Sequence, residues 1–168
     1  MGALALEFTI LNASRSGEVF GGLRSEIDDG LWTIPAERMK AKKEHRIPLS
    51  PRSLEILAVA SAMEPESKYL FSRSNKALSN MAMAMILRRL KIDPTVHGFR
   101  SAFRDWASEE TSHSSEVIEM ALAHSIQNKV EAAYRRKDLL EKRRVLLLDW
   151  ETYCSNTSTL NVIQLKAA

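Results

Sequence analysis

The segment TVHGFRSAFRDW, residues 95–106, decides how the rest of this chain is interpreted. Its large apolar residues, Phe99, Phe103 and Trp106, recur at steps of three and four residues. This spacing is typical of one face of an α-helix. We therefore expect a helix that packs its aromatic face into a hydrophobic core.

The same segment carries basic residues on its other side. At about 100° of rotation per residue, His97, Arg100 and Arg104 fall opposite the aromatic face. The pattern predicts that these groups point away from the core. Two permanently charged guanidinium groups would then face one common space.

A second polar group follows further along the chain. Ser114 and Ser115 are suitable N-cap residues for an apolar run that ends at His124. Ten residues later stands Tyr134, which is followed by two arginines. The chain thus presents a tyrosine, histidines and arginines within about forty residues, which are the residue types that phosphodiester chemistry uses.

These motifs carry a resemblance to a known family. The sequence resembles the C-terminal part of tyrosine recombinases, and in particular the prophage and genomic-island integrases, over about residues 4–153. The matching motifs are HGFR at 97–100, LAH at 122–124, AAYRR at 132–136, IPAERMK at 34–40 and NKVEAAY at 128–134. The resemblance implies a mainly α fold with a small antiparallel β-sheet (α+β), the fold of the integrase catalytic domain.

Two further stretches extend the resemblance. ASRSGEV, residues 13–19, is similar to the family's first arginine motif, with Arg15 as the arginine and Glu18 as its supporting acid. The alternative is a serine-capped helix start with Arg15 in solvent. In the family one lysine of a β-hairpin reaches the active site, and the position relative to Ile-Pro-Leu favours Lys40 over Lys42 and Lys43.

The resemblance implies strand cleavage in DNA by transesterification. A tyrosine hydroxyl, with a pKa of about 10, needs nearby positive charge to act as a nucleophile. Arginine forks can hold phosphate oxygens bidentately, and a lysine can protonate the departing 5′-oxygen. Two histidines would surround the scissile phosphate. The candidate catalytic residues are Tyr134, Arg15, Arg100, His97, His124 and Lys40, with Glu18 in support.

Bulk composition sets wider limits. A length of 168 residues suits one domain, and 45% hydrophobic with 27% charged residues is ordinary for a globular protein. The net charge of +3 permits a nucleic-acid partner without requiring one. One cysteine and no zinc-ligand spacing predict no disulfide, metal or cofactor. Without a leader or a span of about 20 apolar residues, we expect a cytoplasmic bacterial protein.

Local patterns predict the remaining elements. The expected hairpin joins residues 31–34 to residues 45–49 across a charged connector. The expected helices are 3–11, a helix to about 63 with Leu54, Leu57 and Ala58 on its apolar face, 78–90 with its methionines in the core, and 138–153 with Lys142, Arg143 and Arg144 pointing outward. His45 and His113 match no motif and are expected to be structural or exposed.

Domain organisation and partners follow from the resemblance. We expect residues 1–153 to be an N-terminally truncated catalytic domain without the arm-binding and core-binding domains, and residues 154–168 to be a tail. Its partners would be double-stranded DNA at attachment sites and further copies of itself, as a tetramer on DNA and a monomer in isolation. Two alternatives remain: a catalytically inactive DNA-binding remnant of an integrase, and a helical interaction module that uses the last helix and the tail.

Overall fold

The protein is mainly helical with small antiparallel sheets, as the fold-class prediction expects. The computed structural model describes residues 1–93, 95–124 and 138–156. Its helices are α1 (Gly2–Leu11), α2 (Ser16–Phe20), α3 (Pro51–Met63), α4 (Ala82–Arg89), α5 (Gly98–Glu109), α6 (Ser115–Ala121) and α8 (Leu140–Ser155), with short 3-10 helices η1 (Arg24–Glu26) and η2 (Ala36–Arg38). Its strands are β1 (Ile27–Asp28), β2 (Leu31–Ile34), β3 (His45–Pro48), β4 (Ser72–Arg73) and β5 (Lys76–Ala77).

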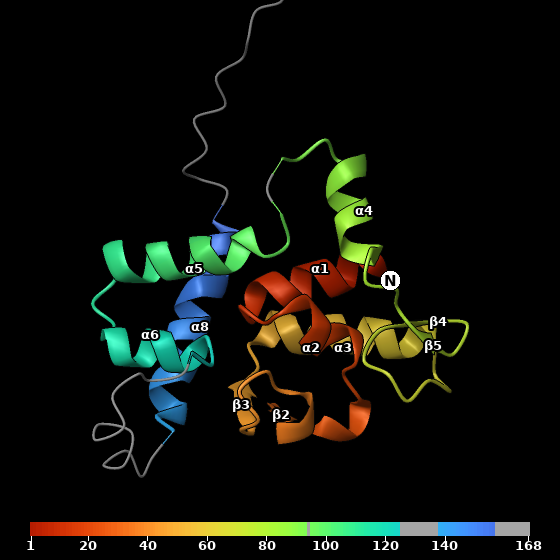
Figure 1. The fold of residues 1–168 in the computed structure, drawn as a ribbon, viewed down its shortest axis with the longest axis horizontal. Helices are drawn as coiled ribbons and strands as arrows, with labels where there is room; N and C mark the ends of the chain where they lie inside the picture. The colour runs from red at the N-terminus through yellow and green to blue at the C-terminus, as the bar shows by residue number, and fades with distance from the viewer. Residues whose placement is uncertain (94, 125–137, 157–168) are drawn as a thin grey trace, which may run out of the picture.

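The elements form two groups that share one helix. In Figure 1, α5 and α6 lie to the left, while α1, α2, α3 and the sheets lie to the right. Helix α8 contacts both groups, since it packs against α5 and α6 as well as α1 and β3. Trp150 of α8 also donates a hydrogen bond of 2.9 Å from its indole nitrogen to the carbonyl of Ile10 in α1. The two groups are therefore joined through α8.

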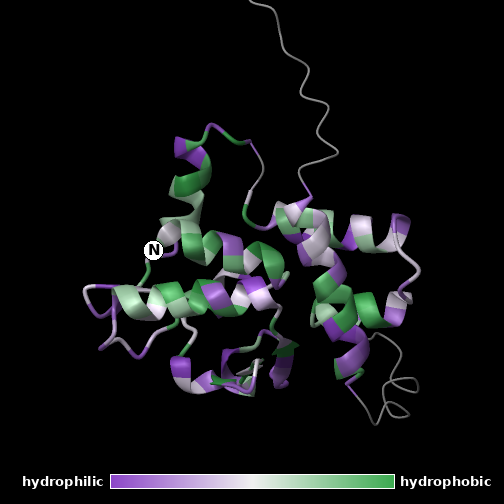
Figure 2. Ribbon diagram, turned by 180° about the vertical axis from the view of Figure 1, so that it is seen from behind, coloured by the Kyte–Doolittle hydropathy of each residue, from purple (hydrophilic) through white to green (hydrophobic). Residues whose placement is uncertain are grey.

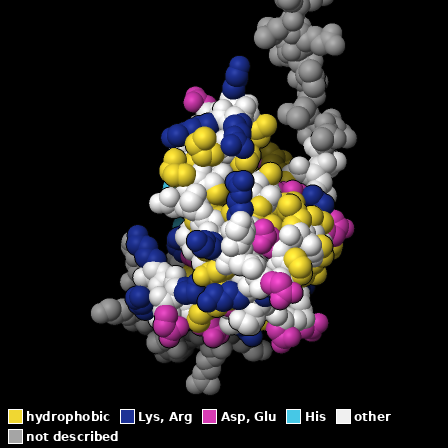
Figure 3. All heavy atoms as spheres, turned by 90° about the vertical axis from the view of Figure 1, so that its right-hand side faces the viewer, with side chains coloured by type: hydrophobic (Ala, Val, Ile, Leu, Met, Phe, Trp, Pro, Cys, Tyr) yellow, Lys and Arg dark blue, Asp and Glu magenta, His cyan; other side chains and the backbone are white. Residues whose placement is uncertain are grey.

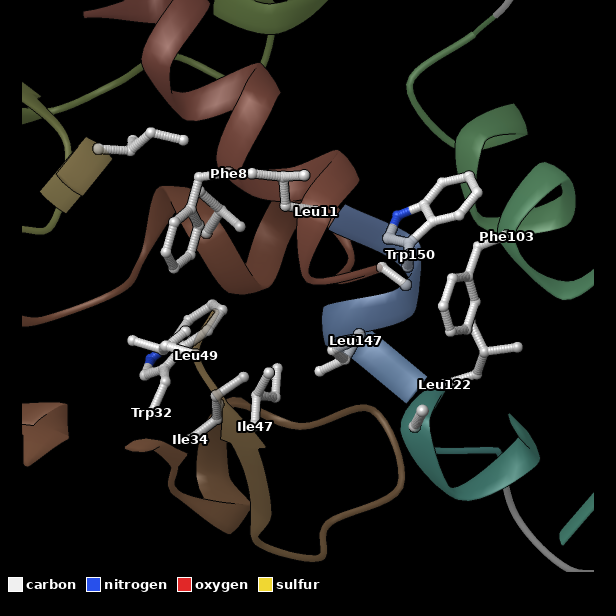
Figure 4. Packing of buried hydrophobic residues seen from close by; sticks show 14 of the residues in the cluster. Phe8, Leu11, Trp32, Ile34, Ile47, Leu49, Phe103, Leu122, Leu147 and Trp150 are labelled. Carbon is white, nitrogen blue, oxygen red and sulfur yellow. The ribbon is translucent and has the colours of Figure 1, made fainter. Parts of the chain in front are cut away.

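The hydrophobic core runs between these groups. Figure 4 shows side chains of α1 and the sheet on one side, side chains of α5 and α6 on the other, and Leu147 and Trp150 of α8 between them. Phe103 and Trp150 meet edge to face, with ring centroids 5.4 Å apart. The aromatic face predicted for α5 is confirmed at Phe103, which is fully buried.

Helix α1 is the central element of the larger group, and its prediction as a buried helix is confirmed. Figure 2 shows it as largely hydrophobic, which is typical of a helix that is covered on several sides. The Phe8 ring lies 5.4 Å from that of Trp32 in β2 and 5.3 Å from that of Phe71. Helix α1 also packs against α3, so it contacts both the sheet and that helix.

The predicted hairpin is also confirmed. Strands β2 and β3 pair antiparallel, with Trp32 opposite Ile47 and Ile34 opposite His45. Strand β1, which the sequence pattern did not predict, pairs with the other edge of β2. Because side chains alternate along a strand, His45 and Ile47 share the buried face of β3.

Two helices bury a face other than the predicted one. In α3 the buried residues are Ser53, Ile56 and Ala60, whereas Leu54 is 39% exposed. Ser53 is accommodated inside because its hydroxyl accepts a hydrogen bond of 3.0 Å from the Asn12 amide.

In α4 the expected methionine core is wrong for most of its members. Met83 and Leu87 are buried, while Met81, Met85 and Leu90 are exposed. The helix packs against α1, and its buried residues are Met83 and Leu87, so only one of these methionines reaches the core.

Helix α8 corrects a further prediction. Arg143, expected to point outward, is 2% exposed, although Lys142 and Arg144 follow the prediction more closely. Its position explains the burial: Arg143 precedes Leu146, Leu147 and Trp150 at helical spacing and lies on the same face. The buried guanidinium is satisfied by hydrogen bonds to the Asp138 and Arg46 backbones and to the Asp138 carboxylate.

Helices α1 and α6 end in the same way. After each, an alanine adopts the left-handed conformation, Ala13 with φ 44° and Ala123 with φ 49°. The amide of the residue that follows bonds back to the third-last helical residue, from Ser14 to Thr9 (3.2 Å) and from His124 to Glu119 (3.0 Å). These are Schellman endings, which reverse the chain sharply. Each reversal comes within two residues of a predicted site residue.

Candidate active site

Arg100 is a buried member of the predicted catalytic set. The sequence pattern predicted that it points away from the core, but the structure places it in the interior, 6% exposed. Its guanidinium donates hydrogen bonds to the carbonyls of Ala13 and Leu122, the latter at 2.7 Å. Those carbonyls belong to the two Schellman endings, which leave helix carbonyls without partners inside the helix. The ends of α1 and α6 therefore hold Arg100.

Arg15 is held by Glu18. The Glu18 carboxylate accepts a hydrogen bond of 2.8 Å from the Arg15 amide and one of 2.7 Å from its guanidinium. Glu18 is 5% exposed, whereas the Arg15 side chain is 27% exposed. The buried Glu18 carboxylate thus fixes the Arg15 guanidinium, which remains partly exposed to solvent. Glu18 thus orients Arg15, and its supporting role in a reaction stays a prediction.

Arg15 and Arg100 approach one another at the carbonyl of Leu122. Arg15 reaches this oxygen at 3.5 Å and Arg100 at 2.7 Å, each through its Nη2. Burial first, and then repulsion from Arg15, lower the pKa of Arg100 to about 10, with Glu18 opposing the shift. Arg100 therefore remains charged at neutral pH. An anion bound between them would relieve their repulsion.

Lys40 lies in the turn between β2 and β3 and is exposed. It lines an open pocket of about 370 Å³ together with Arg15 and Glu18. Lys42 lines the same pocket, and Lys43 does not. The structure thus brings the predicted lysine to the side on which Arg15 reaches solvent.

His124 follows the Leu122 carbonyl by two residues and is 40% exposed. Its Nδ1 lies 2.6 Å from the Glu119 carboxylate, which also accepts a hydrogen bond of 2.7 Å from Arg104. Burial raises the pKa of the Glu119 carboxyl, but the hydrogen bonds with Arg104 and His124 outweigh burial. The net effect is a lowered pKa of Glu119. Arg104 therefore orients the partner of His124.

A cavity of about 450 Å³ lies beside His124. It is bounded by the β2–β3 connection, the end of α6 and the start of α8, and Met39 lines both this cavity and the Lys40 pocket. The ionisable residues around it are Lys43, Glu44, His45, Arg46, His124, Asp138 and Arg143. The two hollows are therefore neighbours on either side of Met39.

Sequence reasoning missed His45 as a neighbour of this site. Burial, then Arg143, Arg100 and Arg15, lower its pKa to about 3, against a hydrogen bond with the Ala121 backbone. The imidazole is neutral at physiological pH as a result. The two-residue alternation of β3, which pairs His45 with buried Ile47, was the signal that could have located it.

The remaining histidines, His97 and His113, line neither of these two pockets. His97 is exposed at the N-terminal end of α5, where its carbonyl accepts a hydrogen bond of 3.0 Å from the Arg100 amide. His113 contacts Asp149 of α8 at 2.7 Å, in keeping with the structural role expected for it. Tyr134 lies outside the described residues, so its place in the site stays a prediction.

Comparison with known proteins decides the family. A family model described as the phage integrase family matches residues 3–140 of the chain. The chain belongs to the phage integrase family. The sequence-based prediction of a tyrosine recombinase catalytic domain is confirmed at this level.

Individual relatives agree with this assignment. The prophage integrase IntA of Escherichia coli (strain K12) is 32% identical over 148 residues, which cover 84% of this chain and 36% of the relative. The integrase of Enterobacteria phage P4 is 30% identical over 175 residues, covering 91% and 40%. The chain thus spans about two fifths of the length of these integrases.

The fold is similar to a solved integrase domain. The lambda integrase catalytic core superimposes with a TM-score of 0.59 at 19% identity, over 76% of this chain and 82% of that one. Within residues 1–93, 95–124 and 138–156, no cluster of three or more histidine, cysteine or acidic side chains could hold a metal ion. The helices of that part also include none long and apolar enough to cross a membrane.

Proposed function

We propose that residues 1–153 form the catalytic domain of a site-specific recombinase that integrates or excises DNA such as a prophage or genomic island. The observation that carries the proposal is the convergence of Arg15 and Arg100 on the Leu122 carbonyl, beside the Lys40 pocket. Two guanidinium forks at one point suit the two non-bridging oxygens of a phosphodiester. Membership of the phage integrase family supports this reading.

The chemistry would proceed through a protein–DNA ester. Tyr134 attacks the phosphorus, the bond to the 5′-oxygen breaks, and a 3′-phosphotyrosyl bond forms. Arg15 and Arg100 neutralise the charge that grows on the phosphate in the transition state. Lys40 donates the proton that the departing 5′-oxygen takes up.

The remaining residues assist these steps. His97 and His124 would donate to or accept from the phosphate and the phenol. Because the phosphotyrosyl ester keeps about the same energy as the bond it replaces, a different 5′-hydroxyl can attack it and reseal the strand. This exchange is recombination, and it needs no nucleotide cofactor.

Duplex DNA and further copies of the chain are the proposed partners. Lambda integrase, of similar fold, has been solved as a dimer on a core site and as a tetramer on a Holliday junction. On the face in Figure 3, Lys and Arg side chains are scattered among hydrophobic ones. We therefore expect this domain alone to bind DNA weakly, without sequence preference, and less tightly as salt rises.

The proposal is tested with a pool of nicked duplexes in which the sequence around the nick is randomised. Cleavage near a nick releases a short fragment, so the covalent adduct cannot reseal and accumulates. Adducts that survive denaturant are sequenced for their DNA and digested for their phosphotyrosyl peptide.

We expect the peptide to contain Tyr134, and Tyr134→Phe to abolish the adduct with DNA affinity within about twofold, since only the hydroxyl is lost. Tyr153→Phe, at an exposed tyrosine of α8, is the matched control. An adduct formed by the Tyr134→Phe protein would place the nucleophile elsewhere. DNA binding without any adduct in the parent protein would favour an inactive DNA-binding remnant.

A further inference from the structure

Asp138 is fixed to the β2–β3 hairpin by two arginines. Arg46 of β3 donates to one oxygen of its carboxylate from two nitrogens, at 2.9 and 2.7 Å. Arg143 of α8 reaches the same oxygen at 3.2 Å. We call these three residues the Asp138 anchor. Charge-assisted bonds of this kind are stronger and more directional than neutral ones.

The backbone takes part in the anchor as well. Arg143 donates from Nε to the carbonyl of Asp138 at 2.8 Å and from Nη1 to the carbonyl of Arg46 at 2.5 Å. One buried guanidinium therefore ties the hairpin, residue 138 and α8 together. Breaking it would leave a buried charge without partners, which is strongly unfavourable.

The residue after Asp138 has an unusual conformation. Leu139 adopts φ 51° and ψ 36° immediately before α8, a left-handed conformation that leucine avoids. Such a conformation persists where the surroundings impose it. Leu139 also packs partly buried against the core. Both observations indicate that the chain at 138–139 is held in place from several directions.

The anchor limits where Tyr134 can be. Tyr134 precedes Asp138 by four positions, and an extended chain covers at most about 3.6 Å per step, so roughly 14 Å is the greatest distance between their Cα atoms. Towards His124 the separation is ten residues, which allows about 35 Å. Asp138 is therefore the stricter of the two limits. Asp138 itself lines the 450 Å³ cavity with His45 and His124.

We propose that Arg46 and Arg143, acting through Asp138, are positioning residues that keep Tyr134 within reach of the phosphate held by Arg15 and Arg100. The inference rests on the proposed role of Tyr134. The anchor consists of the three described residues alone, and Tyr134 enters only through its distance along the chain. Arg46 and Arg143 touch no reacting atom in this scheme.

The charges at the anchor agree with this role. Burial opposes ionisation of Asp138, but Arg46 and Arg143 outweigh it and lower the pKa of the carboxyl. The carboxylate is therefore charged throughout the neutral range, where it can pair with both arginines. Asp138→Asn keeps the shape and the backbone carbonyl while removing the charge.

The first measurement concerns position and needs no activity. In a Cys154→Ser protein, spin labels are attached at Tyr134→Cys and at Glu55→Cys, an exposed site on α3, and their distance distribution is recorded by pulsed electron resonance. We expect Asp138→Asn to broaden or shift the distribution. Glu141→Gln, which removes a carboxylate paired with Arg144 on the outer side of α8, should leave it as in the parent. An unchanged distribution in Asp138→Asn overturns the proposal.

The second measurement concerns rate. With the nicked duplexes that trap the adduct, Asp138→Asn should form it roughly tenfold to a hundredfold more slowly, because small misplacements of a nucleophile are costly. DNA affinity should stay within about twofold, and Asp138→Glu should recover much of the rate. Arg46→Gln, which spares buried Arg143, should act in the same direction if Asp138→Asn folds poorly.

The two failures are distinguishable. A broadened distribution with an unchanged cleavage rate refutes the positioning role and leaves the proposed function intact. A parent protein that makes no adduct refutes the proposed function, whatever the labels report.

Discussion

In the proposed site, Arg100 and Lys40 would supply positive charge under opposite physical conditions. Arg100 is buried, and two carbonyls from the ends of α1 and α6 fix its guanidinium. Lys40 is exposed in the turn of the β2–β3 hairpin, beside Arg15. A group that must hold a phosphate benefits from a fixed geometry, because it costs no reorganisation when charge develops. A group that must deliver a proton can approach from a turn.

The largest expected effect comes from removing the Arg100 guanidinium, which two carbonyls fix in place. Arg100→Lys keeps the charge, but one ammonium cannot replace the fork at both carbonyls and at the phosphate. We expect adduct formation to fall roughly thousandfold. The free energy of unfolding should fall by about 1–3 kcal/mol, since a buried carbonyl loses its donor.

Arg52→Lys is the matched control, because Arg52 is 44% exposed and pairs with Glu7 and Glu55 at the surface. Urea unfolding and the covalent trapping assay measure the two effects. An Arg100→Lys protein with the stability and activity of the Arg52→Lys protein would contradict the comparison.

Substitution of Lys40, in the exposed β2–β3 turn, should affect the cleavage rate but not the stability. Lys40→Ala is expected to slow cleavage roughly hundredfold, through loss of a general acid, with no measurable change in stability. Placing sulfur at the 5′ position of the cleaved bond should restore the rate, because a thiolate leaves without a proton. Lys42→Ala and Lys43→Ala are the controls. Rescue by sulfur in one of those two variants, and not in Lys40→Ala, would move the general acid along the turn.

The smallest effect concerns His45, a buried residue near Arg100. Its pKa is about 3 in the folded protein, lowered by burial and by Arg143, and about 6.5 in an unfolded chain. Between these pH values His45 is protonated in the unfolded chain and neutral in the folded protein. The contribution of His45 to the free energy of unfolding is therefore fully present above about pH 6.5 and is lost as the pH falls. The slope should approach about 1.4 kcal/mol per pH unit below pH 6.

Urea unfolding between pH 7 and pH 5 measures this slope, and a His45→Gln protein should lack that part of it. A parent and a His45→Gln protein with identical pH profiles would show that His45 titrates alike in both states. Acidic groups such as Asp138 contribute at lower pH, because the pKa of Asp138 is itself lowered. The histidine contribution is therefore separable near pH 6.

The elements with strong local periodicity could be predicted from the sequence. Helix α5 follows from the spacing of Phe99, Phe103 and Trp106, and the hairpin follows from two short β-prone runs around a charged connector. The motifs around Arg15, Arg100 and His124 indicated the family without any coordinates. Each of these signals is contained in a few neighbouring residues, so it can be recognised from the sequence alone.

The faces of several helices could not be predicted in the same way. In α3 and α4 apolar residues occur on more than one side, so the pattern alone does not select the buried one. Contact with α1 selects Ile56 in α3, and Met83 in α4 beside Thr9. Partner elements, not the helices themselves, decide which side is covered.

The sequence by itself determined which residues this chain has for the proposed phosphoryl transfer, and in what order. Only the tertiary structure decided that Arg100, His45 and Arg143 lie inside. Arg100 meets the Ala13 carbonyl across 87 residues of chain, and Arg143 meets Arg46 across 97. A buried charge is tolerated only where such partners converge on it. That convergence depends on how α1, α6 and α8 pack, and no local pattern of residues contains it.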